Sequence, residues 1–286
     1  MATLQNRRDF LKKAGVVTGL SQLPFSGWSE GFSSLLGAGI NPDGEFSILK
    51  LEKLLPAYQF PFIDRFSTRL FKLHYSLYNL YGNTATNAGE FLIDAAVRGE
   101  KWQFKFISSR LANNGIKDSG QVFKYWVSGD VVCENNGTLS PEKWSVESKI
   151  SLTGNGVPYG STGIVNNGEI KNGVVCLNTG NKKSRKPLGN MGLSWKWGLI
   201  AVVQKMAEDS TTALQFALLD EFDALFQNQN LKFRRKVTLD CGNNRKIDFK
   251  VFELTGDGVL PTVYWVDNLN RALFVISGME AYVLKD

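Results

Sequence analysis

The sequence predicts a mainly β protein of the α+β class, built as a large curved antiparallel sheet or half-barrel packed on one or two helices. Apolar and polar residues alternate in segments between about residues 70 and 152, and again from residue 231 onward. This period of two is typical of half-buried strands. Asn-Gly and Asn-Asn turn sequences separate several of these segments, and such residues accept positive φ at low cost.

The first elements are expected between residues 46 and 77. Spacings of three and four predict a short helix that Pro56 ends, with apolar residues at Ile48, Leu51, Leu54 and Leu55. Alternation then begins and predicts the strand that opens the sheet. Its two faces carry different residues: Leu70, Lys72, His74 and Ser76 on one, Phe71, Leu73, Tyr75 and Leu77 on the other.

Further strands are expected at 89–98, 102–110, 122–133 and 144–150, with turns at 113–115 and 135–137. Their spacing favours an antiparallel meander over βαβ units. Residues 153–192 are rich in Gly and Asn and predict a loop with a short hairpin around 174–177.

Two apolar segments, 193–207 and 212–226, are then expected to be helices, the second capped by Ser210 or Thr211. Strands resume at 231–240, 245–254, 262–267 and 271–277, and residues 281–284 are expected to close the sheet.

The N-terminus has the features of an export signal. Arg7 and Arg8 are followed by Phe10, Leu11 and Lys12, and then by a weakly apolar run without charge from residue 14 to residue 29. A positive segment before a short apolar one is typical of secretion. The pattern resembles the twin-arginine translocation signal. This resemblance implies that the twin-arginine machinery engages residues 1–25 and carries the folded protein to the periplasm or the exterior of a bacterial cell.

We therefore divide the chain into an export signal, residues 1–30 with its end between 25 and 39, a flexible lead-in, 31–45, and one β-rich domain, 46–286, with a loop and helical insert at 153–226. No run of 18 apolar residues occurs, so no stable membrane span is expected after signal removal. The net charge of +6 comes without a nucleic-acid recognition motif, so no nucleic-acid partner is expected.

Composition limits the available catalytic chemistry. His74 is the single histidine, and the sequence contains no G-x-S-x-G, H-E-x-x-H or Walker lysine motif. Cys133, Cys176 and Cys241 form no C-x-x-C pair and are expected as small apolar residues in strands, with one disulfide among them left open. No metal site and no cofactor are expected.

Tryptophans are the candidate ligand-binding residues, because indole rings either stack on sugar rings or pack in a core. Trp195 and Trp197 are two residues apart and cannot share one face of a helix. The four that we single out as ligand contacts are Trp102, Trp126, Trp144 and Trp265.

Carboxylates leave an enzymatic alternative open, a carbohydrate-active hydrolase, since a glycosidase needs two carboxyl groups several Å apart across a cleft. The candidates are Asp220, Glu221 and Asp223 on the second predicted helix, and Asp130, Glu134, Glu147, Asp248 and Glu253 on or beside strands.

The C-terminal part contains a Leu-Pro-x-x-x-Trp-Val-Asp-x-x-x-Arg hairpin from Leu260 to Arg271. With its paired strands, the segment 90–286 resembles half-barrel periplasmic domains related to bacterial lipoprotein-localisation factors. That resemblance implies a concave sheet holding an apolar ligand such as an acyl chain, without catalytic residues. We therefore expect a non-catalytic envelope protein that binds a lipid-like or glycan ligand or supports an envelope assembly.

Overall fold

A computed structural model describes residues 66–81, 84–113, 121–154, 157–189, 191–240 and 246–285. Within these residues one sheet of fifteen strands encloses a single helix, α4 (Leu199–Asp209). The predicted fold class, a large curved antiparallel sheet with a helix, is confirmed. The export signal, the helix expected before Pro56, and Cys241 lie outside the described residues.

The strands form two wings. The N-terminal wing contains β1 (Leu70–Tyr81), β2 (Thr84–Arg98), β3 (Lys101–Asn113), β4 (Gln121–Glu134), β5 (Pro141–Gly154), β6 (Val157–Lys171), β7 (Val174–Thr179) and β8 (Lys182–Pro187). The C-terminal wing contains β9 (Gly192–Trp195), β10 (Ala213–Asp220), β11 (Ala224–Asp240), β12 (Lys246–Thr255), β13 (Thr262–Val266), β14 (Ala272–Ser277) and β15 (Glu280–Leu284).

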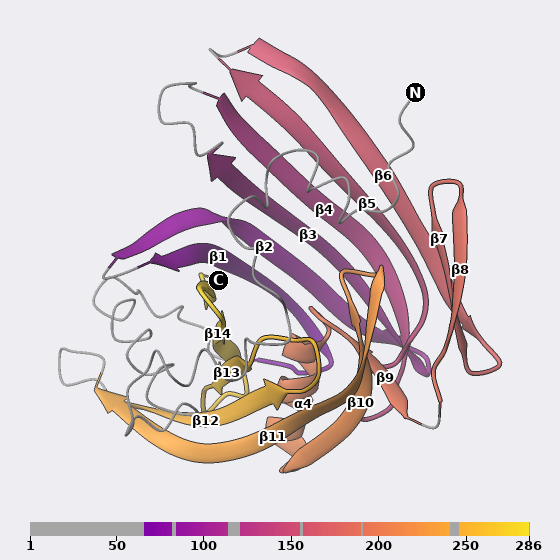
Figure 1. The fold of residues 1–286 in the computed structure, drawn as a ribbon. Coiled ribbons are helices and arrows are strands. Elements are labelled where there is room, and N and C mark those ends of the chain that lie inside the picture. The colour runs from indigo at the N-terminus through magenta and orange to yellow at the C-terminus, as the bar shows by residue number, and fades with distance from the viewer. Residues whose placement is uncertain are drawn as a thin grey trace.

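The wings join at one place, where β1 pairs antiparallel with β15. From this joint each wing extends as a meander, so the sheet begins at β8 and ends at β9, which pairs parallel with β10. The two edge strands are consecutive in the chain but are not hydrogen-bonded to each other. The result is a curved, unclosed barrel (Figure 1). Residues 281–284 form a strand of the sheet, as expected, but they do not close it, because β15 lies in its interior between β1 and β14.

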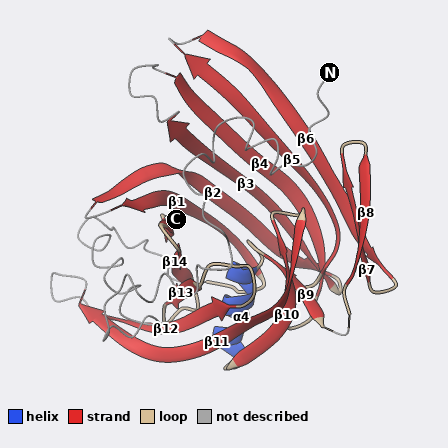
Figure 2. Cartoon of the chain, viewed as in Figure 1, coloured by secondary structure: helices blue, strands red, loops and turns tan. Residues whose placement is uncertain are grey.

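We call the concave side of the sheet, where α4 lies (Figure 2), the lumen. In β1 the predicted alternation holds, with Phe71, Leu73, Tyr75 and Leu77 buried on one face. By contrast, β13, β14 and β15 bury almost every residue on both faces. The N-terminal wing therefore has a solvent face that the central strands of the C-terminal wing lack.

The first predicted helix forms, but it is shorter than expected. Leu193 to Trp195 belong to β9, and α4 begins only at Leu199. Ser210 ends α4 with a left-handed φ of 55°. The Lys250 ammonium donates to the Ala207 carbonyl at 2.6 Å, which holds the last turn of α4 against β12.

The second predicted helix, 212–226, is wrong, because this segment forms β10 and the start of β11. Residues 216–219 are all buried, and a strand that is covered on both faces gives a continuous apolar run that periodicity does not distinguish from a buried helix. The turn after Asp220 reverses the chain, so Ser210 and Thr211 cap no helix there.

The expectation of a loop at 153–192 is also wrong, because β6, β7 and β8 occupy most of it. Backbone pairing needs few apolar residues when a strand lies at an exposed edge, and β8 is exposed at all but one of its positions. The hairpin expected around 174–177 is confirmed as β7 paired with β8.

The Trp-Val-Asp-x-x-x-Arg sequence forms the hairpin between β13 and β14, and its acidic and basic residues have a structural role there. Asp267 and Arg271 are both buried. One carboxylate oxygen of Asp267 accepts from the backbone N–H groups of Leu269 and Arg271, at 3.0 and 2.8 Å. The other pairs with the Arg271 guanidinium at 2.7 Å. The motif is thus a buried ion pair that fixes a turn, and its role is structural.

Candidate functional site

The inward face of β3 changes from aromatic to charged along its length. Every second residue points into the lumen, in the order Trp102, Phe104, Phe106, Ser108 and Arg110, and the first four of these are buried. Two residues of a strand advance about 6.6 Å. Three aromatic levels are therefore followed by a hydroxyl level and a guanidinium level.

Neighbouring strands continue this order of polarity. Pairing across β4 places Ser148 of β5 level with Ser108. Pairing across β4 and β5 places Asn166 of β6 level with Phe106. Trp144 of β5 lies one level further into the aromatic part. This order is only partly kept across the sheet, because the apolar residues Phe91 of β2 and Val127 of β4 are level with Ser108, and Ile150 of β5 is level with Arg110.

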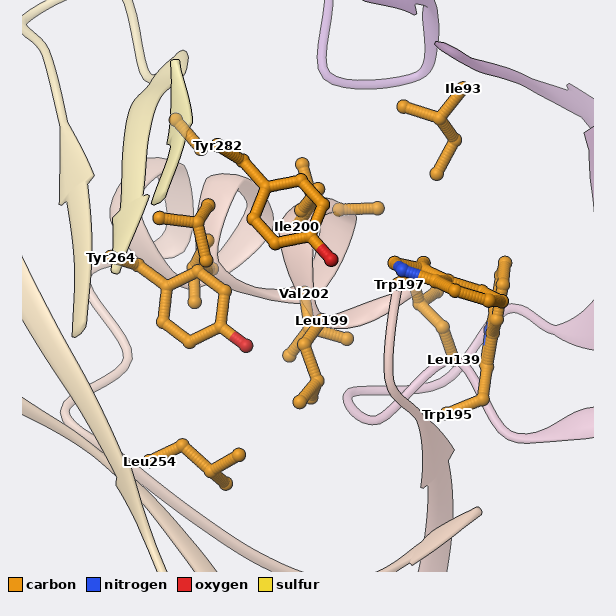
Figure 3. Packing of buried hydrophobic residues seen from close by; sticks show 14 of the residues in the cluster. Ile93, Leu139, Trp195, Trp197, Leu199, Ile200, Val202, Leu254, Tyr264 and Tyr282 are labelled. Carbon is orange, nitrogen blue, oxygen red and sulfur yellow. The ribbon is translucent and has the colours of Figure 1, made fainter. Parts of the chain in front are cut away.

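Phe222 closes the aromatic part from the C-terminal wing. Its ring centroid lies 5.4 Å from that of Trp195, 5.8 Å from Trp144, 6.0 Å from Phe106 and 6.4 Å from Trp197. These separations are typical of favourable ring contacts. Figure 3 shows Trp195 and Trp197 beside the start of α4. The cluster joins both wings and the helix.

A strained turn delivers Phe222 to this position. Glu221 and Phe222 both have positive φ, 48° and 62°, and the Asp223 N–H donates to the Asp220 carbonyl at 3.2 Å. Left-handed backbone costs a residue other than Gly about 1–2 kcal/mol. Burial of the Phe222 ring offsets this cost. The same turn leaves Glu221 in the charged part of the lumen.

The charged layer, as we name Arg110, Lys196, Asp220, Glu221 and Glu280, contains two groups of ion pairs. The Arg110 guanidinium lies 2.5 Å from Glu280 and donates to the Tyr282 hydroxyl at 2.7 Å. The Lys196 ammonium lies 3.1 Å from Asp220 and 3.5 Å from Glu221. Both signs of charge are present, and the side chains come from β3, the β9–α4 connection, the end of β10, the β10–β11 turn and β15.

The two groups influence each other electrostatically. Burial disfavours the Arg110 cation, but Tyr282, Glu280 and Glu221 together raise its pKa above the usual range. Burial likewise opposes the charge on Lys196, whereas Glu221 and Asp220 raise its pKa. Solvent nevertheless reaches the layer, because the side chains of Arg110, Lys196, Asp220 and Glu221 are 26–36% exposed. The layer is therefore wet, charged and enclosed by strands.

Two phenols border the layer. Figure 3 shows the hydroxyl oxygens of Tyr264 and Tyr282 directed toward the side where Trp197 lies. Both rings are nearly fully buried. Burial raises the pKa of Tyr264 above its usual range, with Lys196 acting in the opposite direction. At neutral pH Tyr264 is therefore a neutral hydrogen-bonding group.

The structure places the four predicted ligand-binding tryptophans in different surroundings. Trp102 and Trp144 are buried in the lumen wall, and the Trp102 indole donates to Asn135 at 3.0 Å. Trp265 packs against Phe249, with ring centroids 5.7 Å apart. Trp126 is half-buried, and the Lys124 ammonium lies 4.9 Å from its ring centroid. These four residues do not converge on one site, and their role in ligand binding stays a prediction.

Of the candidate carboxylates, Asp220 and Glu221 meet at Lys196, as described. The Glu147 carboxylate pairs with Lys149 at 2.9 Å, and Asp248 accepts from the Thr238 hydroxyl at 2.5 Å. Each of the remaining candidates contacts a different group. Asp130 pairs with Lys105, Glu134 accepts from Asn136, and Glu253 accepts from Arg234. The backbone carbonyl of Asp223 accepts from Lys186.

Other kinds of site are not seen in the described parts of the chain. There, no three His, Cys, Asp or Glu side chains are grouped as metal ligands. Cys133 and Cys176 are free thiols, and burial raises the pKa of Cys133 above its usual range. No described helix has the length and apolar character needed to cross a bilayer.

The residues of the candidate site that the sequence did not single out are Arg110, Ser148, Asn166, Lys196 and Glu280. One signal for them was available: the spacing Trp-x-Phe-x-Phe-x-Ser-x-Arg from Trp102 to Arg110, on a single strand. The others become neighbours only through the pairing of distant strands.

Comparisons with known proteins do not assign the chain to a family. No family model matches the chain, and no curated protein matches it in sequence. Among solved structures it is similar to a β-barrel-like protein of the domain of unknown function DUF1849 from Brucella abortus, with a TM-score of 0.48 and 8% identity. The likeness covers 75% of this chain and 96% of that chain.

Proposed function

We propose that this protein is an exported, non-catalytic envelope protein that binds an amphiphilic, lipid-like ligand in the lumen. The observation that carries the proposal is the order of side chains along β3, from aromatic through hydroxyl to guanidinium. An amphiphile has the same order of polarity, since an apolar chain joins a charged headgroup through a polar linkage. Apolar surface drives such binding, and a few placed polar groups orient the ligand.

The charged layer favours a headgroup that carries both signs of charge. Arg110 and Lys196 would bind a phosphate, while Asp220, Glu221 and Glu280 would bind an ammonium group. A zwitterionic headgroup adds no net charge to the lumen, and each of its two ions would face layer groups of opposite sign, which limits the cost of burying them. A zwitterionic phospholipid with one acyl chain, lysophosphatidylethanolamine, has this composition.

The carboxylates favour binding over hydrolysis. Asp220 and Glu221 are adjacent in the chain and share one lysine as partner. A glycosidase instead places an acid and a base on opposite sides of the bond that breaks. The same residues suit recognition of a cationic group.

Binding is tested with the full mature chain, purified from the periplasm of an expressing bacterium and analysed by native mass spectrometry. We expect a co-purified lipid, and saturable binding of lysophosphatidylethanolamine below its micelle-forming concentration. The Arg110→Met/Glu280→Gln double variant removes one ion pair without changing net charge. We expect it to weaken binding about tenfold or more, since hydrogen bonds to charged groups contribute about 1.5–3 kcal/mol.

Arg98→Met is the matched control, because Arg98 is exposed at the end of β2 and its loss should leave binding unchanged. Absence of both a co-purified lipid and saturable binding would contradict the proposal. Equal binding by the double variant and the wild type would show that the charged layer does not take part in ligand binding.

Export is tested separately by fusing residues 1–40 to a reporter protein. Replacement of Arg7 and Arg8 by Lys should abolish export if the twin-arginine machinery is the route. Unchanged export of this variant would exclude that route and would leave the lumen proposal intact.

A further inference from the structure

Asn166 is a buried amide residue that the fold leaves without a hydrogen-bond partner, and Gln204 of α4 is another. Asn166 points inward from β6 and is 1% exposed, and neither its amide oxygen nor its amide nitrogen has a hydrogen-bond partner in the protein. On β5, Ser148 is also buried, and its hydroxyl has no partner either. Buried polar groups are almost always hydrogen-bonded, and each exception requires an explanation.

The positions of these two residues follow the polarity of the lumen. Ser148 is level with Ser108, one step beyond Phe106 toward Arg110, and Asn166 is level with Phe106 itself. Trp144 and Gly168 lie one further step into the aromatic part, where the Trp144 indole occupies the space that a side chain at 168 would fill. Asn166 and Ser148 therefore lie at the boundary between the polar and the aromatic parts, while the partnerless indole N–H groups of Trp144, Trp195 and Trp197 lie within the aromatic part.

An amide side chain at such a boundary specifies the chemistry of its partner. The Asn166 nitrogen donates and its oxygen accepts, so a complementary group presents an acceptor and a donor close together. The glycerol of a one-chain phospholipid has this arrangement, with an ester carbonyl beside a free hydroxyl. Its acyl chain would extend toward Trp144 and its phosphate toward Arg110.

We infer that Asn166, assisted by Ser148, recognises the acyl-ester linkage of the ligand, and that the lumen therefore selects ester-linked over ether-linked lipids. This inference rests on the proposed function and specifies the ligand class of the same site. A partnerless amide destabilises the ligand-free protein, because its hydrogen bonds to water are lost on folding. Binding of the ester restores them.

The test compares two probes that differ only at the linkage: lysophosphatidylethanolamine with an acyl ester, and its ether analogue with the same chain length and headgroup. For the wild-type protein we expect the dissociation constant of the ether to be about tenfold higher, the effect of leaving a buried polar group unpaired. For Asn166→Leu, which is close in volume but apolar, we expect the two dissociation constants to be equal.

Asn167→Leu is the matched control. It changes the adjacent residue of β6, which is exposed on the opposite face, and it should keep the preference for the ester. A second measurement follows thermal unfolding without ligand. Asn166→Leu should unfold at a higher temperature than the wild type, because an unsatisfied polar group has been removed from the interior.

Each other outcome overturns a defined statement. If the wild type does not prefer the ester, or if Asn166→Leu keeps that preference, the inference is wrong while the proposed function stands. If ligand-free Asn166→Leu unfolds at a lower temperature, the amide is satisfied by buried water and its role is structural, which also overturns the inference. If neither probe binds the wild type, the proposed function fails.

Discussion

The two wings of the sheet solve the same problem, the burial of strand side chains, in different ways. In the N-terminal wing β1 buries one face and leaves Leu70 and Lys72 in solvent. In the C-terminal wing β13, β14 and β15 are buried on both faces. The turns differ in the same sense, because a neutral, half-buried Asn136 organises the β4–β5 turn, whereas a buried Asp267–Arg271 pair organises the β13–β14 turn.

This difference separates stability from recognition. Strands covered on both faces contribute the most apolar burial per residue and have little room for polar groups. Strands with a solvent face tolerate exceptions on the inner face, and Ser108, Ser148 and Asn166 are such exceptions. We therefore expect substitutions in the C-terminal wing to cost stability, and inner-face polar substitutions in the N-terminal wing to change binding.

The largest expected effect on stability is at the turn between β13 and β14 in the C-terminal wing. Asp267→Ala leaves the Arg271 cation buried without its partner and should lower the free energy of unfolding by about 3–5 kcal/mol. Chemical denaturation of the full chain measures this change. Asp257→Ala, at an exposed turn of the same wing, should change it by less than about 0.5 kcal/mol. Similar costs for the two variants would contradict the structural role of the buried pair.

An intermediate effect is expected inside the N-terminal wing. A Cβ atom at Gly168 would lie 2.1 Å from the Trp144 ring. Gly168→Ala must therefore displace the indole, and overpacking of this kind costs about 1–3 kcal/mol. On the same strand, a Cβ atom at Gly163 would have its nearest contact at 3.5 Å, so Gly163→Ala should be close to neutral. Equal unfolding free energies for both variants would show that the Trp144 ring yields freely.

The smallest effect is expected where the wings meet on the outer face. The hydrogen bond from Lys285 of the C-terminal end lowers the pKa of Glu90, burial acts against it, and His74 adds to the lowering. A carboxylate with a lowered pKa stabilises the fold above its unfolded-state pKa, and this contribution disappears as the pH falls through the folded-state value.

Glu90→Gln should therefore cost roughly 0.2–1 kcal/mol at pH 7, as is typical of exposed ion pairs, and nothing at a pH below the folded-state pKa. Unfolding free energies across the acid range test this, with Glu100→Gln in the exposed β2–β3 turn as control. A cost that persists at low pH would mean that Glu90 acts through packing instead of charge.

The fold class could be predicted because alternation is a local property that survives in strands such as β1. The helix expected over 212–226 could not be corrected from the sequence, since Phe216 to Leu219 are buried on both faces of a strand and lose their alternation. A loop was expected over 153–192 in place of β6, because the Asn and Gly residues of this segment favour turns in isolation. Backbone pairing with β5 instead makes the segment a strand.

The candidate site could be predicted only in part from the sequence, for the same reason. Trp102 was identified by its type, and the alternating residues up to Arg110 lie on its own strand. Asn166, however, lies in a segment rich in Asn and Gly, a composition that is also typical of turns. Only pairing across β5 shows that its side chain faces inward. Lys196 and Glu280 reach the lumen through the β10 and β1 pairings, which no local pattern predicts.

The order of the strands also has a consequence for how the chain acquires its structure. Every strand pair within a wing joins consecutive strands, and every one except the parallel β9–β10 pair is antiparallel, so each wing can grow largely by adding hairpins with short loop closures. The meeting of β1 with β15 alone spans the whole described chain. The sheet is therefore completed only when β15 has been synthesised, and a chain cut short before Glu280 would lose the strand pairing between the wings and depend on side-chain contacts such as those of Phe222 with Phe106 and Trp144.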